Sequence, residues 1–190
     1  MDTFDEIRSL FAGRGGGAYF GEPVSMLEHA LQAAHFAARD GAAPELILAA
    51  LLHDVGHLLE DAPEDIAEWT RDARHERSGA RWLAQRFGRE VSDPVRLHVA
   101  AKRYLCATEP SYIEALSPAS RHTLKLQGGL ASAEEVAAFR AEPGSRAAVQ
   151  VRYCDDRGKV AGLTTAPLEA YRELILAHAH GAIGRDAAGR

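Results

Sequence analysis

Apolar residues recur along most of this chain at intervals of three and four positions, the spacing that gathers side chains on one face of an α-helix. Runs that alternate apolar and polar positions, which would indicate β-strands, are nearly absent. The pattern therefore predicts an all-α fold. It predicts helices over residues 3–12, 25–41, 44–59, 75–87, 93–106, 132–140, 144–157 and 166–181.

Local signals mark some of the helix ends. Ser25 and Glu28 form a capping box at the start of the second predicted helix, and Gly41 ends that helix. Asp93 followed by Pro94 has the residue types of an N-cap and a first helical position. These signals place two helix starts and one helix end.

Three stretches between the predicted helices lack the helical spacing. Residues 13–17 (Gly-Arg-Gly-Gly-Gly) predict a flexible loop, and they do not match a phosphate-binding loop because no GxxxxGK[ST] motif is present and no strand precedes them. Residues 60–73 are acidic and predict a solvated connection, while residues 107–129 predict a loosely structured region.

At 190 residues the chain is long enough to bury a core without disulfides or structural zinc. We expect one domain, in which residues 1–17 form an N-terminal helix and Gly-rich loop and residues 182–190 a flexible tail.

A net charge of −5 and a pI near 6.0 argue against a nucleic-acid or anionic-membrane surface. Cys106 and Cys154 form no CxxC motif, the first residues lack the order of a signal peptide, and no apolar run has the length of a membrane span. We therefore expect a cytoplasmic protein, a monomer or small homo-oligomer, with no nucleic-acid or membrane partner.

The predicted helix over 44–59 carries His53 followed by Asp54 near its end. Burying an imidazole and a carboxylate at the end of an apolar, alanine-rich helix is costly unless something compensates for the lost hydration. A divalent metal ion compensates, because a neutral imidazole and a carboxylate can bind it together and the carboxylate can bridge to a second ion. A His-Asp dipeptide by itself is more often a hydrogen-bonded surface pair, so the rest of the chain decides between the two.

Further histidines and a late aspartate follow the helices in order. His29 lies near the start of the second predicted helix, and His75 begins another. His98 lies midway along the next helix, and Asp155 lies late in a later one. Together with the His-Asp pair, this order resembles the HD-domain superfamily, whose helical bundle gathers such residues around one or two metal ions. The two intermediate histidines extend the set to a dinuclear site. The remaining histidines are expected to be ordinary surface or helix-end residues: His35, His122, His178 and His180.

Several blocks of sequence narrow the resemblance. Residues 98–106 are similar to a helix that carries a metal-binding histidine and a cation for the substrate. Residues 116–124 and 127–129 are similar to a block of the mixed-valent diiron oxygenases that cleave carbon–phosphorus bonds, and so are residues 19–22 and 152–156. The resemblance covers about residues 18 to 160 and implies the fold and chemistry of that group.

For the metal site, the resemblance implies a mixed-valent Fe(II)/Fe(III) pair as cofactor and O2 as co-substrate. It implies that one iron is held by His29, His53, Asp54 and Asp155, and the other by the bridging Asp54, His75 and His98. Tyr19 would cap the first iron until substrate binds, and Glu22 would move with it. Without the resemblance, Tyr19 is interpreted as a buried aromatic beside a flexible loop and Glu22 as a solvated charge. His57, one turn after His53, is expected on the metal side as well.

A phosphonate carries up to two negative charges, so its site needs cations and uncharged donors in a water-poor pocket. Lys102 lies one helical turn after His98, and Arg152 lies three residues before Asp155, so each is expected on the face that carries a metal ligand. Ser120, Thr123 and Gln127 form one helical stripe of uncharged donors. The alternatives are snorkelling surface cations for Lys102 and Arg152 and a helix cap for Ser120.

The implied reaction is the oxidative cleavage of the C–P bond of an (R)-1-hydroxyphosphonate that carries a 2-amino or 2-(trimethylammonio) group, giving phosphate and glycine or glycine betaine. Aromatic residues that could enclose a quaternary ammonium slightly favour the trimethylated substrate. A metal-dependent phosphohydrolase acting on nucleotides is the first alternative, disfavoured by Tyr19 and residues 120–129. A non-catalytic metabolite sensor is the second, disfavoured by the complete ligand set. A polyol-opening oxygenase is the third, and the chain is short for that group.

Overall fold

A computed structural model describes residues 1–59, 72 and 74–180. It contains, in order, α1 (Thr3–Arg14), α2 (Met26–Arg39), α3 (Pro44–Leu52), α4 (Val55–Leu59), α5 (His75–Ala84), α6 (Arg89–Thr108), α7 (Pro110–Ala115), α8 (Pro118–Leu126), α9 (Ala133–Ala141), α10 (Ser145–Arg157), the 3₁₀ turn η2 (Leu168–Tyr171) and α11 (Arg172–His178). Within these described ranges the only β-structure is one isolated bridge between Ala18 and Ser25, so the all-α prediction is confirmed. The predicted connection over 60–73 falls outside the described residues except for Asp72. Arg74, the residue before the predicted helix start, lies just beyond this connection and is described. The predicted tail over 182–190 lies wholly outside them.

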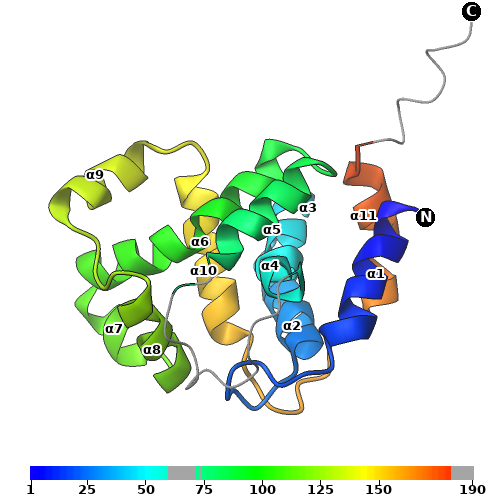
Figure 1. The fold of residues 1–190 in the computed structure, drawn as a ribbon, viewed down its shortest axis with the longest axis horizontal. Helices are drawn as coiled ribbons and strands as arrows, with labels where there is room; N and C mark the ends of the chain where they lie inside the picture. Colours follow the sequence, from blue (N-terminus) through cyan, green and yellow to red (C-terminus); the bar gives the residue numbers. More distant parts are fainter. Residues whose placement is uncertain (60–71, 73, 181–190) are drawn as a thin grey trace, which may run out of the picture.

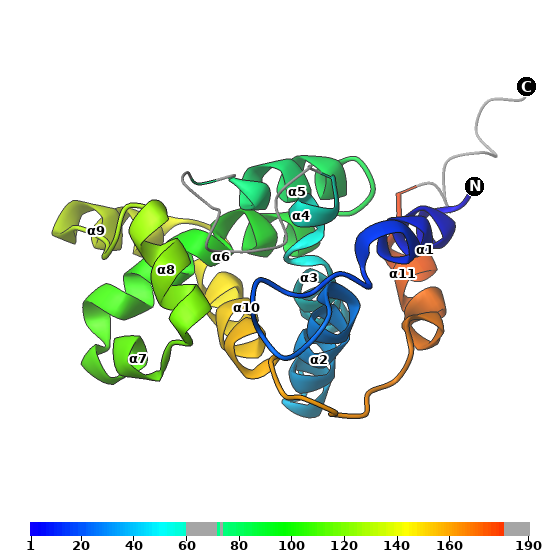
Figure 2. The same ribbon diagram turned by 60° about the horizontal axis from the view of Figure 1, so that its bottom comes forward.

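The helices α2, α3, α6 and α10 pack against one another at the centre of the molecule, with α5 against α6 and α4 against α5 (Figure 1). At one end of the molecule α1 and α11 lie side by side, as both views show (Figure 2). At the other end α7, α8 and α9 gather around the C-terminal half of α6. This arrangement surrounds the ends of several helices with protein, which is where the polar cluster described below lies.

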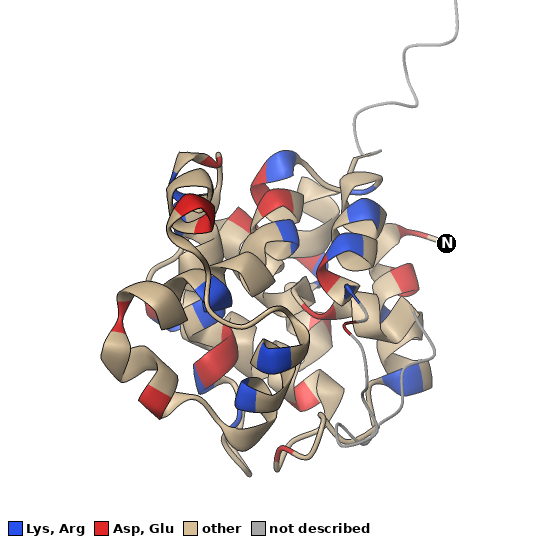
Figure 3. Cartoon of the chain, turned by 60° about the vertical axis from the view of Figure 1, so that its left-hand side comes forward, with Lys and Arg blue, Asp and Glu red and all other residues tan. Residues whose placement is uncertain are grey.

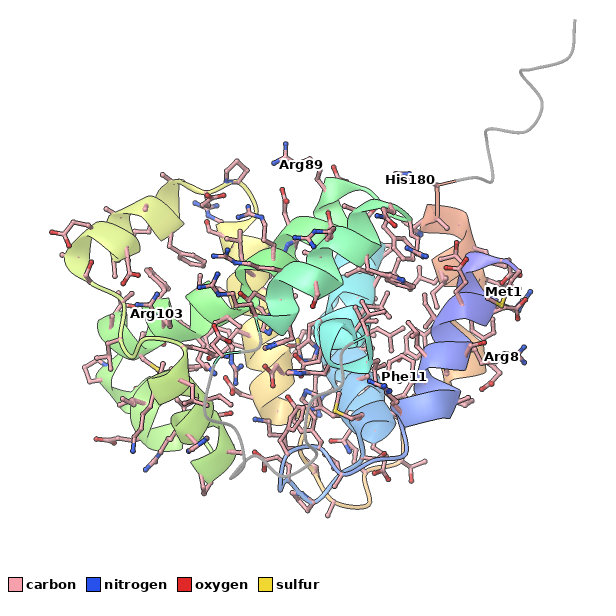
Figure 4. All side chains as sticks on the ribbon, viewed as in Figure 1. Met1, Arg8, Phe11, Arg89, Arg103 and His180 are labelled. Atoms are coloured by element: carbon pink, nitrogen blue, oxygen red, sulfur yellow. The ribbon has the colours of Figure 1, made fainter. Side chains whose placement is uncertain are left out.

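The apolar faces of these helices form the core. The helix α3 is buried almost throughout, with Leu48, Leu51 and Leu52 at most 1% exposed. Burial of each leucine side chain contributes roughly 1.5–3 kcal/mol to folding. The N-terminal helix α1 joins this core through one face, on which Phe11 points toward the bundle while Arg8 points outward (Figure 4). The core therefore connects the first helix of the chain to the central ones.

Several predicted helix boundaries are confirmed, and one near the N-terminus shifts. The capping box is present, since Ser25 and Glu28 each accept a hydrogen bond from the other's backbone N–H. The first helix is longer than predicted, so that Gly13 and Arg14, expected in the flexible loop, belong to α1. Its extension is compatible with the sequence because a single glycine near a helix end costs only about 1 kcal/mol.

The prediction that a helix starts at Asp93 and Pro94 is wrong, because α6 begins four residues earlier, at Arg89. Pro94 lies inside this helix, where it removes one backbone hydrogen bond. The earlier start buries Val91 as well as Val95, which are at most 1% exposed. This burial offsets the lost hydrogen bond.

The loosely structured region predicted over 107–129 is wrong as well, because most of it is helical as α7 and α8. Each of these helices has proline at its first position, Pro110 and Pro118, where the missing N–H costs nothing. In addition, the Ser117 side chain accepts a hydrogen bond from the backbone N–H of Ser120 and caps α8. Prolines that suggest irregular structure are here the starts of short helices.

The single helix predicted over 44–59 is interrupted at His53 and Asp54, between α3 and α4. Successive residues of a continuous helix point about 100° apart, so His53 and Asp54 could not both face one point there. In the structure both side chains are buried, and His53 Nε2 lies 3.3 Å from Asp54 Oδ2. The interruption is what the uniform apolar pattern of the segment did not indicate.

Gly56, in the first turn of α4, lies against the backbone of α5. A β-carbon at Gly56 would overlap the carbonyl group of His75 and lie 2.9 Å from the Ser78 hydroxyl. We expect Gly56→Ala to lower the free energy of unfolding by about 1–3 kcal/mol, as overpacking does elsewhere. Gly13→Ala is the control, because a β-carbon there meets nothing within 4 Å and alanine favours the helix. Urea unfolding of the two variants measures the difference, and equal stabilities would contradict the prediction.

On the face shown in Figure 3, basic and acidic residues are interspersed along the helices. This mixture agrees with the moderate net charge of −5. Among the helices that the structure describes, none combines the length and the apolar character needed to cross a bilayer.

Candidate dinuclear metal site

The residues predicted to bind metal come together at the centre of the bundle. The elements that contribute them are α2 (His29), the turn between α3 and α4 (His53 and Asp54), the start of α5 (His75), the middle of α6 (His98) and the end of α10 (Asp155). All of these side chains are at most 8% exposed. Residues that are far apart in the sequence thus form one buried polar cluster.

Two groups of donor atoms share Asp54. In the first, the Nε2 atoms of His29 and His53 are 3.1 Å apart, and they lie 3.7 and 3.3 Å from Asp54 Oδ2. In the second, the Nε2 atoms of His75 and His98 are also 3.1 Å apart, and they lie 3.2 and 3.5 Å from Asp54 Oδ1. Each group can hold a metal ion, and the carboxylate of Asp54 directs one oxygen to each. The cluster therefore fits a dinuclear metal site.

The other nitrogens of three histidines are held by backbone carbonyl groups. His29 Nδ1 donates to Gly158 O at 2.8 Å, His53 Nδ1 to Ala50 O at 2.8 Å, and His98 Nδ1 to Val95 O at 2.7 Å. These bonds fix each ring with its Nε2 lone pair turned into the cluster, as is usual for metal-bound histidines. Two Nε2 atoms only 3.1 Å apart would repel each other through their lone pairs unless a proton or a metal ion lies between them.

The pKa values of the clustered histidines also fit a metal site. Burial lowers the pKa of His29 to about 4 and that of His98 to about 3, so both imidazoles are neutral near pH 7. Burial alone would also lower the pKa of His53, but the nearby Asp54 and Asp155 raise it to about 9. Without metal, the cluster thus retains a proton that a metal ion would replace.

Asp155, rather than its neighbour Asp156, faces the cluster. Its Oδ1 atom lies 3.5 Å from His29 Nε2 and has no hydrogen-bond partner among the described residues, while its Oδ2 accepts a hydrogen bond from Arg152. Asp156 is partly exposed and turns away toward Tyr112. The buried oxygen of Asp155 that accepts no hydrogen bond is a further observation that fits a metal ion.

Tyr19 closes the cluster on one side. Its hydroxyl donates to Asp54 Oδ2 at 2.7 Å, and its ring stacks on His29 at 3.8 Å between centroids. Burial, together with the charges of Asp54 and Asp155, raises the pKa of Tyr19 well above its usual value, so the hydroxyl keeps its proton. Nearby, Glu22 accepts a hydrogen bond of 2.5 Å from Ser117. Both residues belong to the loop between α1 and α2, which folds back over the cluster.

The residues predicted to bind substrate line one small cavity next to the cluster. The cavity lining includes Tyr19, His57, Lys102, Ser120, Thr123, Gln127 and Arg152, together with Asp54, His75, His98 and Asp155. Its volume is about 40 Å³, which admits a few water molecules but no phosphonate. Because Tyr19 is part of the lining, its displacement would enlarge the cavity.

Cationic and hydroxyl groups face each other across this cavity. Lys102 is 3% exposed and donates to Thr123 Oγ1 at 2.9 Å. Burial lowers the pKa of Lys102 to about 7, with a smaller contribution from the charge of Arg152. The charged and the neutral form of Lys102 are therefore both populated near neutral pH, and an anion in the cavity would favour the charged form.

Sequence analysis missed Lys159, which lies beside the cavity. Its ammonium donates to Ser120 Oγ at 2.9 Å and lies 3.6 Å from Glu22 Oε1 and 3.8 Å from Asp155 Oδ1. The spacing of four residues after Asp155 could have indicated it. It follows Gly158, where α10 has ended, so the helical rule does not strictly apply. Val99, which also lines the cavity, carried no signal beyond its apolar character, whereas Phe20 lies in the block over 19–22 that carries the family resemblance.

The histidines expected to be ordinary lie away from this cavity. His35 packs edge-on against Phe36, and His178 donates to the carbonyl oxygen of Leu174. His122 and His180 do not line the cavity either. Of the chain's nine histidines, those at the cavity or cluster are the ones predicted from the order of the helices, together with His57, which was predicted from its spacing after His53.

The comparison with known proteins agrees with this geometry. The family model of the HD domain matches residues 26–155, a segment that spans the cluster from His29 to Asp155. The helical bundle with its buried His/Asp cluster is thus of the HD type, and the chain belongs to the HD-domain family. The resemblance seen in the sequence is confirmed.

Individual relatives are more specific. The chain is 48% identical over 159 residues to the [1-hydroxy-2-(trimethylamino)ethyl]phosphonate dioxygenase (glycine-betaine-forming) of Leisingera caerulea, covering 84% of this chain and 81% of the relative. It is 45% identical over 157 residues to a hydroxymethylphosphonate dioxygenase of Gimesia maris, covering 82% and 78%. It is also 35% identical over 178 residues to the uncharacterized protein L432 of Acanthamoeba polyphaga mimivirus, covering 93% and 81%.

Proposed function

We propose that this protein is a diiron oxygenase that uses O2 to cleave the C–P bond of a 1-hydroxyphosphonate and release phosphate. Two relatives with 45–48% identity are named as phosphonate dioxygenases. The observation that carries the proposal is the shared carboxylate of Asp54, which faces two pairs of histidines beside a cavity lined with cations and hydroxyls. No feature of the cavity resembles a pocket for a nucleotide base, so the hydrolase alternative has no comparable support among the described residues.

The proposed substrate is (R)-1-hydroxy-2-(trimethylammonio)ethylphosphonate or (R)-2-amino-1-hydroxyethylphosphonate, with glycine betaine or glycine as the second product. The name of the Leisingera relative supports the trimethylated compound. The name of the Gimesia relative adds hydroxymethylphosphonate as a third compound to test. All three share the phosphonate and the 1-hydroxyl group, which are the parts that the cations and donors of the cavity would bind.

In this proposal one iron is held by His29, His53, Asp54 and Asp155, and the other by Asp54, His75 and His98. Neutral imidazoles with carboxylates, one of them bridging, are a donor set suited to two irons. When bound, the iron pair supplies the binding and reduction of dioxygen. The protein holds the ions at fixed positions through the backbone bonds of the histidines.

The remaining residues bind and orient the substrate. Lys102, Ser120, Thr123, Gln127 and Arg152 supply the charge and the donors for the three phosphonate oxygens. Tyr19 occupies the cluster until the substrate takes its place, and Glu22 moves with the same loop. His57 stacks on the ring of His75 at 3.8 Å and lies on the cavity wall, from which it can bond a phosphonate oxygen. With the loop closed, these residues exclude water from the reacting carbon.

The function is tested by oxygen uptake coupled to phosphate release. Iron-loaded protein is offered each of the three hydroxyphosphonates and, separately, a nucleoside monophosphate. We expect one phosphate for each O2 consumed with a hydroxyphosphonate, and the highest kcat/KM identifies the substrate. Phosphate release from the nucleotide without oxygen uptake would overturn the proposal in favour of a phosphohydrolase. Tight binding of a phosphonate without turnover by the two-iron protein would favour a sensor.

The pKa of Lys102 leads to a pH prediction. Its ammonium is charged below about pH 7 and loses its proton as the pH rises through that value. Because the charged form binds the phosphonate, KM should rise about tenfold for each pH unit above 7. Lys102→Arg keeps its charge, so its KM should rise much less over the same range. The ratio of the KM values of the two enzymes removes the titration of the substrate itself, and a ratio independent of pH would contradict the prediction.

A further inference from the structure

The guanidinium of Arg152 is hydrogen-bonded to three neighbouring side chains, those of Tyr112, Asp155 and Asp156. It is 4% exposed, and its Nη1 donates to Asp155 Oδ2 at 2.5 Å. Its Nε donates to Asp156 Oδ2 at 3.1 Å and to Tyr112 Oη at 3.0 Å, while its Nη2 donates to Asp156 Oδ1. The hydroxyl of Tyr112 in turn donates to Asp156 Oδ2. The guanidinium therefore has two neighbouring carboxylates but is paired with them unequally.

The unequal pairing has a geometric cause. Asp156 takes the bidentate side of the guanidinium, through Nε and Nη2, which is the strongest and most directional arrangement for this pair. With the guanidinium held in this orientation, its one bond to Asp155 runs from Nη1 to Oδ2. Oδ1 of Asp155 stays without a hydrogen bond and faces His29 at 3.5 Å.

We propose that Asp156 and Tyr112 are positioning residues for the metal site. By holding the Nε–Nη2 edge of Arg152, they fix the orientation in which the guanidinium bonds Asp155 Oδ2 alone, and so keep Asp155 Oδ1 available to a metal ion. This inference rests on the part of the proposed function that makes Asp155 a metal ligand. The pairing with Asp156 also divides the positive charge of Arg152 between two carboxylates, which leaves Asp155 a stronger donor to a cation.

The first test is Fe(II) binding to the metal-free protein without oxygen, measured by competition with a chelator. Wild type should bind two ions. In Asp156→Asn, Arg152 is released to Asp155, so one of the two ions should bind about 10–100-fold more weakly, as is typical when a partner of a metal ligand is lost. The other ion, beside His75 and His98, should keep its affinity. Tyr112→Phe preserves the Asp156 charge and should cause a smaller loss at the same site.

The chain offers matched controls. Asp40→Asn removes the exposed partner of Arg157, at the end of the same helix, and should leave both affinities unchanged. Tyr153→Phe removes a hydroxyl that bonds the surface residue Glu109 and should also have no effect. Thermal unfolding of each metal-free variant tests for a general loss of structure.

A double-variant cycle tests whether the effect passes through Arg152. Lysine cannot make a bidentate pair, so in the background of Arg152→Lys the substitution Asp156→Asn should change Fe(II) affinity much less than in wild type. Unchanged binding of both ions in Asp156→Asn would overturn the inference. Equal weakening of both ions together with a lower unfolding temperature would overturn it as well, because the role would be structural.

This experiment is separable from the test of activity. If wild type binds two Fe(II) ions but consumes no oxygen with any phosphonate, the proposed reaction fails while the binding results still decide the inference. If wild type binds fewer than two ions, the metal-site assignment itself is refuted, and the inference with it.

Discussion

Asp54→Asn is expected to remove both metal ions and, with them, the oxygenase activity. The carboxylate of Asp54 directs one oxygen to His29 and His53 and the other to His75 and His98, so an amide at this position weakens both sites at once. The charge stabilisation that a metal pair supplies is several kcal/mol, which corresponds to a loss of activity of about 10³-fold or more.

Metal analysis after gel filtration, together with oxygen uptake, measures this effect. Asp40→Asn is the matched control, because it removes a carboxylate whose partner is exposed Arg157. His98→Ala, by contrast, should weaken mainly one of the two ions. A variant Asp54→Asn that kept two tightly bound ions would refute the bridging role of this residue.

Lys102→Met should raise KM for the phosphonate about 100-fold with a smaller change in kcat. The substitution keeps most of the side-chain volume but removes the buried ammonium beside Thr123. Loss of one partner of a buried charge pair costs about 2–5 kcal/mol, and about 3 kcal/mol corresponds to the stated factor. The loss should appear as weaker substrate binding because Lys102 is proposed to contact the anion and lies outside the two groups of metal donors.

Steady-state kinetics at pH 6.5, where wild-type Lys102 is largely charged, measures this difference. Lys125→Met is the control, since Lys125 is an exposed residue at the end of α8. Equal KM values for wild type and Lys102→Met would contradict the assignment of this lysine to the substrate.

Much of the site could be predicted from the sequence because the candidate ligands outside the His53–Asp54 turn lie on helices. The positions of His29 and His98 relative to those faces determine that both point inward, where burial makes them neutral. Their convergence with Asp155 required knowledge of how the helices pack, which the resemblance to the HD-domain superfamily supplied. Periodicity alone does not contain that information.

What could not be predicted depends on contacts between distant segments. The interruption at His53 and Asp54 was hidden by an uninterrupted apolar pattern, because the local sequence favours a helix and only the cluster favours a turn. The paired guanidinium of Arg152 was likewise unpredictable, since Tyr112 lies forty residues before it in the sequence. The prolines at the starts of α7 and α8 have two interpretations, and tertiary packing decides between them.

The connection between α2 and the segment after α10 has a consequence for the order of folding. His29 bonds the carbonyl of Gly158, a residue 129 positions away, and the side chain of Gln32 bonds both backbone groups of Val160. During synthesis from the N-terminus, the first histidine pair therefore lacks its last partner until nearly the whole bundle has left the ribosome. Contacts of such long sequence separation form late and slow folding. The candidate metal site is thus completed only once the chain has been synthesised as far as Val160, and a shorter nascent chain lacks the contacts that hold His29 in place.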